Sequence, residues 1–195
     1  MVWAPSATFQ NGQFHVFWSS RFFDASDAQH TGKATDYVIR TATTSDFKTF
    51  SKPTNYAATP GTNLIDQDFL QIDGDNWIRV LKNETLSPGR VFQEQSSTGL
   101  FGTWTRVGDY TTDETDAAEG AALFKDNLDA NLFHMAQDKY TTAKGYVLYS
   151  KKAPVNDPNV LWTRAESTFP QVNKHGQFLQ LDSARFDALN QHYPS

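Results

Sequence analysis

Two carboxylates in this sequence stand in apolar surroundings, where an ionised side chain is poorly solvated. Asp66 follows Ile65, and Glu119 lies between Ala118 and Gly120. Removal from water disfavours the charged form, so we expect the pKa of both carboxyls to be raised. A carboxylic acid with a raised pKa can act as the general acid in glycoside cleavage. The alternative is that both acids are structural and are satisfied by backbone N–H groups or water.

A recurring pattern indicates which elements carry these acids. A short apolar strand, a tight polar turn and an aromatic-rich strand occur three times, over residues 7–18, 68–81 and 122–135. The turns are Asn-Gly at 11–12, Asp-Gly at 73–74 and Asp-Asn at 126–127. Asn, Asp and Gly tolerate the positive φ angles of hairpin turns, so each copy predicts a β-hairpin.

Each hairpin is followed by a second one, which begins near Tyr37, Val91 and Tyr146. Two hairpins make a four-stranded antiparallel sheet, and a repeated four-stranded sheet with aromatic residues at fixed places is typical of a propeller blade. We therefore predict an all-β fold, a single partial β-propeller over 1–195, with blades at about 1–58, 59–113 and 114–168. The tail 169–195 is predicted to contain one more strand at 177–181 and a short turn or helix at 183–190. The alternative is a β-sandwich whose hairpins are similar by accident.

The first strand of each blade lines the central channel of a propeller. These strands are predicted over 3–6, 64–68 and 118–121, and two of the three carry the acids Asp66 and Glu119. The missing side chain at Gly120 predicts room for a sugar ring beside Glu119. Propellers close with about 4–8 blades, so three are too few. We therefore expect a further blade ahead of Trp3, with an open arc or closure by a second chain as alternatives.

Composition excludes several other functions. The net charge is −5 with no cluster of Lys or Arg, which argues against nucleic acid as a partner. The absence of cysteine excludes disulfides, a Cys-ligated zinc and a Cys nucleophile. No apolar run approaches the ~18 residues of a membrane-spanning helix. The sequence contains no phosphate loop, no dinucleotide-binding fingerprint and no pair of histidines at helical metal-ligand spacing.

Several short motifs resemble, in order and spacing, those of glycoside hydrolase family 43, and they cover nearly the whole chain. They are Trp3-Ala4-Pro5 before the first hairpin, Ile65-Asp66-Gln67-Asp68-Phe69, Ala118-Glu119-Gly120, Gly145-Tyr146 and His175-Gly176. The resemblance implies a five-bladed propeller that hydrolyses arabinose- or xylose-containing polysaccharides with inversion, in the manner of arabinofuranosidases and arabinanases.

By position, the resemblance makes Glu119 the general acid and Asp66 the residue that tunes its pKa. The catalytic base would belong to the blade ahead of Trp3, and Asp24 and Asp27 do not match its position. Without a base to activate water, we expect little hydrolysis from this chain. Two alternatives are a non-catalytic carbohydrate-binding fragment and a fragment without a function of its own.

Four further residues are candidates for sugar binding: Trp3, Phe69, Arg90 and His175. For Trp3 and Phe69 the alternative is packing between blades, and for Arg90 a surface position or an ion pair. His175 resembles a late channel histidine that helps some family members to hold calcium through water, but a lone histidine is more often structural. We expect no cofactor beyond that calcium and no nucleic acid or membrane partner. We also expect secretion, although no signal peptide is visible.

Overall fold

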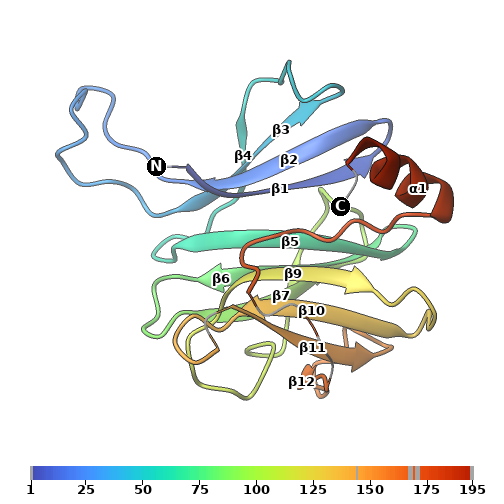
Figure 1. The fold of residues 1–195 in the computed structure, drawn as a ribbon. Coiled ribbons are helices and arrows are strands. Elements are labelled where there is room, and N and C mark those ends of the chain that lie inside the picture. The colour runs from blue at the N-terminus through green and yellow to red at the C-terminus, as the bar shows by residue number, and fades with distance from the viewer. Residues whose placement is uncertain (1, 144, 167–168, 170–171, 194–195) are drawn as a thin grey trace.

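The computed structural model describes residues 2–143, 145–166, 169 and 172–193. Its twelve strands form three four-stranded antiparallel sheets, each with its strands in chain order (Figure 1). This arrangement confirms the predicted all-β fold of propeller blades. The three sheets extend over 2–57, 64–107 and 119–164. Residues 1 and 168, at the ends of the predicted blades, and 170–171 and 194–195 of the tail lie outside the described residues.

The strands have the following bounds. The first sheet contains β1 (Val2–Gln10), β2 (Gln13–Ser20), β3 (Val38–Thr44) and β4 (Thr54–Ala57). The second contains β5 (Leu64–Asp73), β6 (Asn76–Asn83), β7 (Arg90–Ser96) and β8 (Thr105–Val107). The third contains β9 (Glu119–Lys125), β10 (Leu132–Asp138), β11 (Tyr146–Lys152) and β12 (Thr163–Arg164).

The first hairpin of each blade turns where the sequence predicts. Asn11 and Gly12 have φ angles of 52° and 79°, which suit a tight turn between β1 and β2. Gly74 has a φ of 42° between β5 and β6. The third turn is longer than predicted, because it occupies 126–131, where the Asp126 side chain accepts hydrogen bonds from the backbone N–H groups of Leu128 and Asp129.

The first strand of every blade lies at one edge of its sheet, and these three edges meet. Strand β5 lies between β1 and β9 in the middle of the molecule (Figure 1). One apolar core, which includes Phe17, Phe69 and Leu81, joins the first blade to the second. Another, which includes Val80, Met135 and Tyr149, joins the second to the third. Packing between blades therefore holds the inner strands side by side.

The predicted strand at 177–181 does not form. Gln177 makes with its side chain the contacts that a strand would make with its backbone: Oε1 accepts the Ala7 N–H at 3.1 Å, and Nε2 donates to the Ala7 carbonyl at 2.9 Å. The ring of Phe178 packs on Phe124 at a centroid distance of 4.3 Å. Helix α1 (Ser183–His192) follows, with no buried residue. Within the described residues, no helix is both long and apolar enough to span a bilayer.

Candidate active site

Each inner strand contains the same irregularity. In β1, β5 and β9 one extra residue interrupts the pairing with the next strand, between Trp3 and Ser6, between Ile65 and Asp68, and opposite the Ala136–Asp138 step of β10. The residues at the start of these bulges, Ala4, Asp66 and Gly120, have φ angles of 49°, 54° and 55°. A β-bulge re-aims the side chains around it. The three bulges line one cavity together, and Glu119 directly precedes one of them.

Asp66 is buried at the boundary between the second and third blades. Its Oδ2 atom accepts the backbone N–H of Gly120 at 3.0 Å. Burial raises the pKa of Asp66, and this hydrogen bond offsets only part of the effect. The predicted rise in the Asp66 pKa is thus confirmed.

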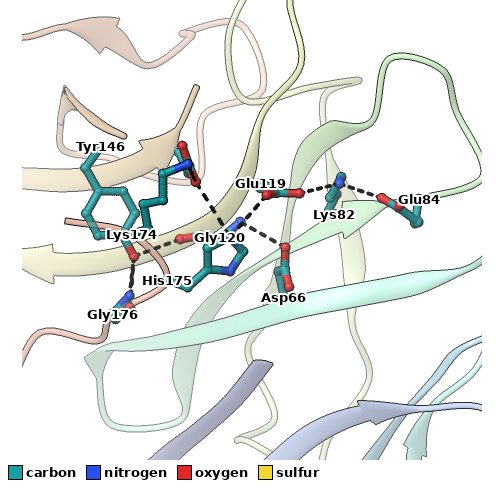
Figure 2. A network of polar contacts seen from close by, with 10 residues as sticks. Asp66, Lys82, Glu84, Glu119, Gly120, Tyr146, Lys174, His175 and Gly176 are labelled. Atoms are coloured by element: carbon teal, nitrogen blue, oxygen red, sulfur yellow. Dashed lines mark hydrogen bonds and ion pairs between the residues drawn. The ribbon is translucent and has the colours of Figure 1, made fainter. Parts of the chain in front are cut away.

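Glu119 has different surroundings. Its Oε1 lies 3.2 Å from Nε2 of His175, and its Oε2 lies 2.7 Å from Nζ of Lys82 (Figure 2). The hydrogen bond from His175 and the charge and hydrogen bond of Lys82 lower the pKa of Glu119 to about 2, against the effect of burial. The prediction that apolar neighbours raise the Glu119 pKa is therefore wrong. The side chains beside it in space are cationic, although its neighbours in sequence are apolar.

His175 enters the site from the C-terminal segment. A Cβ atom on Gly120 would lie 2.9 Å from Nδ1 of His175, so the imidazole occupies the space that the glycine leaves. The expectation of an open place for a sugar ring at Gly120 is wrong for this reason. The hydrogen bond to Glu119 raises the pKa of His175. The hydroxyl of Tyr146 accepts the backbone N–H of Gly176 at 2.6 Å and donates its proton to the carbonyl of Gly120 at 3.0 Å (Figure 2).

Asp138 and Lys174 complete the polar network. The Oδ2 atom of fully buried Asp138 lies 3.1 Å from Nζ of Lys174 and 3.7 Å from Nε2 of His175. Asp138 is the cross-strand partner of Glu119 in the β9–β10 pairing. The imidazole of His175 therefore lies between two carboxylates, which favours its protonated form.

The possibility of a metal rests on three of these residues. One ligand atom each from Asp66, Glu119 and His175 lies within 4.8 Å of the others, which is close enough for one cation. However, Glu119 is already paired with the ammonium of Lys82 and hydrogen-bonded to Nε2 of His175, so both are engaged with each other or with a cation. The group matches an ion-pair network better than it matches the all-oxygen shell that calcium prefers.

The cavity that Asp66 and His175 help to line has a volume of about 30 Å³, enough for one or two water molecules. Its lining includes Ser6, Asp66, Gly120 and His175. A sugar ring is larger than this cavity and would therefore have to bind outside it, at the accessible edge of the site. Glu119 and His175 remain partly exposed there, with 24% and 39% of their side-chain surface accessible.

The structure brings together three of the six predicted site residues: Asp66, Glu119 and His175. Phe69 is buried in the core between the first two blades, where its ring packs on Phe17. Burial of this ring contradicts its predicted contact with sugar and supports the packing alternative.

Trp3 and Arg90 have other neighbours. The ring of Trp3 stacks on Tyr37 at 4.8 Å. The guanidinium of Arg90 lies over the ring of Tyr110 and donates to the carbonyl of Thr112. Neither lines the cavity with Asp66, although Trp3 directly precedes Ala4, which does.

Sequence reasoning missed Lys82 and Asp138. A visible signal existed for Lys82, since it is a charged residue directly after the apolar run Val80-Leu81. Only the strand register shows that Lys82 pairs with Ile65, one residue before Asp66. Asp138 carries a weaker signal, three residues after the predicted strand 132–135.

Solved structures with a similar fold are glycoside hydrolases of several families. A family 117 glycoside hydrolase from the marine bacterium Zobellia galactanivorans matches with a TM-score of 0.62 and 14% identity, over 85% of this chain and 55% of that one. The family 93 α-L-arabinofuranosidase of Fusarium graminearum, solved with arabinobiose, matches with a TM-score of 0.61 and 13% identity, over 91% and 49%.

The α-L-arabinanase of Penicillium chrysogenum, also solved with arabinobiose, matches with a TM-score of 0.56 and 14% identity, over 90% of this chain and 47% of that one. At these identities the likeness shows the fold. The chain spans about half the length of the solved structures it matches.

No curated protein sequence matches this chain. A family model does match, over residues 1–187, and it is described as "Probable glycosyl hydrolase domain" under the name Glyco_hydro_43_rel. The match covers nearly all of the 195 residues and includes the inner strands with Asp66 and Glu119. The chain belongs to this family of glycosyl hydrolase domains, related to glycoside hydrolase family 43.

Proposed function

We propose that this domain cleaves arabinose- or xylose-containing polysaccharides with inversion, with Glu119 as the general acid and Asp66 as the residue that tunes it. One observation carries the proposal: two inner strands bring carboxylate oxygens of Asp66 and Glu119 within 4.8 Å, beside an imidazole. The choice of sugar rests on the family resemblance. It is supported by similar folds that were solved with arabinobiose.

The position of Asp66 suits tuning better than direct chemistry. Inverting glycosidases hold their acid and base about 6.5–9.5 Å apart, so that a water molecule fits between them. The carboxylate oxygens of Asp66 and Glu119 lie within 4.8 Å of each other, which leaves too little room for that water molecule. We therefore assign the base to a further blade, as the family resemblance implies, and expect weak hydrolysis from these 195 residues alone.

The test compares this chain with the same chain extended by an upstream blade. Both proteins are incubated with arabino-oligosaccharides, xylo-oligosaccharides and aryl arabinofuranosides, and the anomer of the first product is followed by ¹H NMR. We expect strong hydrolysis only from the extended protein, with inversion at the anomeric carbon. Retention would contradict the assignment of Asp66, because it requires an enzyme nucleophile close to the acid.

One observation favours a second candidate, a non-catalytic carbohydrate-binding domain. Glu119 is held ionised by Lys82 and His175, and a carboxylate without a proton cannot protonate a leaving group. Calorimetry with arabinobiose separates the two candidates. Binding without turnover in the extended protein would favour the second one. Secretion stays a prediction for both, and export in a secretion assay would test it.

A further inference from the structure

Lys82 connects the inside of the site with its rim. Its side chain is 3% exposed, and its Nζ lies 2.7 Å from Oε2 of Glu119 and 2.5 Å from Oε2 of Glu84. Glu84, with 38% of its side chain exposed, lies just beyond the end of β6. One ammonium group is therefore shared by a carboxylate inside the site and a carboxylate at the surface, as Figure 2 shows.

The absence of a side chain at Gly89 leaves space for the side chain of Lys82. A Cβ atom on Gly89 would lie 2.4 Å from Cε of Lys82. Any side chain at position 89 would thus compete with the lysine for space. On the other side, Nζ lies 5.3 Å from the centre of the Tyr140 ring, a distance that allows a cation–π contact.

Among the basic side chains around Glu119, that of Lys82 lies closest to its carboxylate. The imidazole of His175 is the other partner of Glu119, at 3.2 Å, and it also faces the carboxylates of Asp66 and Asp138. Lys174 lies against Asp138. A general acid must carry a proton when the glycosidic bond breaks, so the contact between Lys82 and Glu119 opposes the proposed reaction until it loosens.

We propose that Lys82 is a positioning residue for Glu119. In the empty site the Lys82 ammonium holds the Glu119 carboxylate aligned and ionised. When Glu119 takes up a proton from solvent, the ammonium moves to the carboxylate of Glu84. The proton then moves from Glu119 to the glycosidic oxygen as the C–O bond breaks, while a water molecule that gives its proton to the base of the further blade bonds to the anomeric carbon. The carboxylate that remains pairs with Lys82 again. The exchange during catalysis rests on the proposed function, whereas the ion pair between Lys82 and Glu119 does not.

The first experiment needs no activity. Carboxyl ¹³C NMR follows the titration of Glu119, whose signal is assigned by its loss in Glu119→Gln. We expect Lys82→Met to raise the titration midpoint of Glu119 by at least about one pH unit, which corresponds to about a tenfold change in proton affinity. Lys82→Arg should restore most of the original midpoint, and Glu84→Gln should not raise it. An unchanged midpoint in Lys82→Met, or in Lys82→Gln if the Met variant does not fold, would overturn the proposal.

The second experiment uses the extended enzyme. Lys82→Met should move the upper pH limit of kcat/KM upward by the same amount as the NMR midpoint. Glu84→Gln should lower kcat at constant KM, because the ammonium then has no second carboxylate. A purely structural lysine would instead lower the rate at every pH without moving the profile, and that result would contradict the exchange. If the wild-type enzyme cleaves no glycoside, the proposed function fails, while NMR still decides whether Lys82 holds Glu119.

Discussion

The backbone N–H of Gly120 donates a 3.0 Å hydrogen bond to Oδ2 of Asp66 across the boundary between the second and third blades. Through this bond Asp66 contacts the residue directly after Glu119. Both partners lie on bulges of inner strands, Asp66 on β5 and Gly120 on β9, which belong to neighbouring sheets. The separation of the two acids is therefore set by sheet geometry, and a site built on strands is held more precisely than one built on loops.

Replacing Glu119 tests its role as the acid. We expect Glu119→Gln in the extended enzyme to lower hydrolysis of arabino-oligosaccharides by roughly 10²–10⁴-fold, the usual contribution of a general acid. The loss should be much smaller for a dinitrophenyl arabinofuranoside, because that leaving group departs without protonation. Steady-state rates on both substrates give the comparison, and near-ultraviolet circular dichroism checks the fold. Equal losses on the two substrates would argue against an acid.

A substitution at Gly120 tests whether the imidazole of His175 needs the space that the glycine leaves. In Gly120→Ala the new methyl group would meet the imidazole at 2.9 Å on a backbone with a φ of 55°. Gly12→Ala is the matched control, since its φ is 79° and no atom lies within 4 Å of the added Cβ. Left-handed backbone costs each variant about 1–2 kcal/mol of unfolding free energy. Urea denaturation should show a larger loss for Gly120→Ala, and equal losses would mean that the imidazole moves aside freely.

The pair of His175 and Glu119 predicts a pH window for stability. Because the pKa of Glu119 is lowered to about 2, its contribution is present above its ordinary value of 4.5 and is lost as pH falls toward 2. The pKa of His175 is raised, so its contribution is full below 6.5 and is lost as pH rises through the folded value. His175→Gln should therefore be most destabilising between these limits, and least in alkaline solution.

Thermal unfolding across this pH range checks the window. The control is His192→Gln, because His192 lies on the exposed helix α1. A pH-independent difference between His175→Gln and the wild type would show that the histidine acts through packing alone.

The buried carboxyl of Asp68 predicts a loss of stability as pH rises, which is opposite to the contribution of Glu119. It is buried on β5, and burial raises its pKa to about 7 in spite of hydrogen bonds from the Leu123 N–H and the Gln177 side chain. Folding must then discharge Asp68 or bury a charge, so the wild type loses stability as pH rises from 3.8 toward 7. Asp68→Asn lacks this titration. Its unfolding free energy relative to the wild type should increase over that range, and a constant difference would contradict the burial effect.

Calcium provides a further test of the ion-pair network. Glu119 is already paired with Lys82 and His175, so we expect neither calcium nor a chelator to shift the melting temperature. A ligand that binds the folded state would raise this temperature in a concentration-dependent way. Differential scanning calorimetry of the wild type over a calcium series measures the effect. A clear rise that His175→Gln removes would restore the calcium proposal.

Much of the fold could be predicted because its signals are local. Asn11-Gly12 and Asp73-Gly74 are turn residues by their own backbone preferences, and the strands on either side follow from short apolar and aromatic-rich runs. The segment 177–181 has a similar apolar run but forms no strand. There a single side chain, that of Gln177, takes over the contacts of the backbone, and no local pattern shows this.

The sequence by itself determined the three repeated blades, the inner strands and the presence of Asp66 and Glu119 on two of them. Tertiary structure decided which groups contact these two acids and in which direction their pKa values shift. The ammonium that pairs with Glu119 comes from 37 residues away and the imidazole from 56 residues away, so apolar neighbours in sequence did not predict the pKa of this carboxyl. Charge interactions act over a few ångströms in space, whatever the separation along the chain. The same packing buried Phe69 in a core and placed Lys82 in the site.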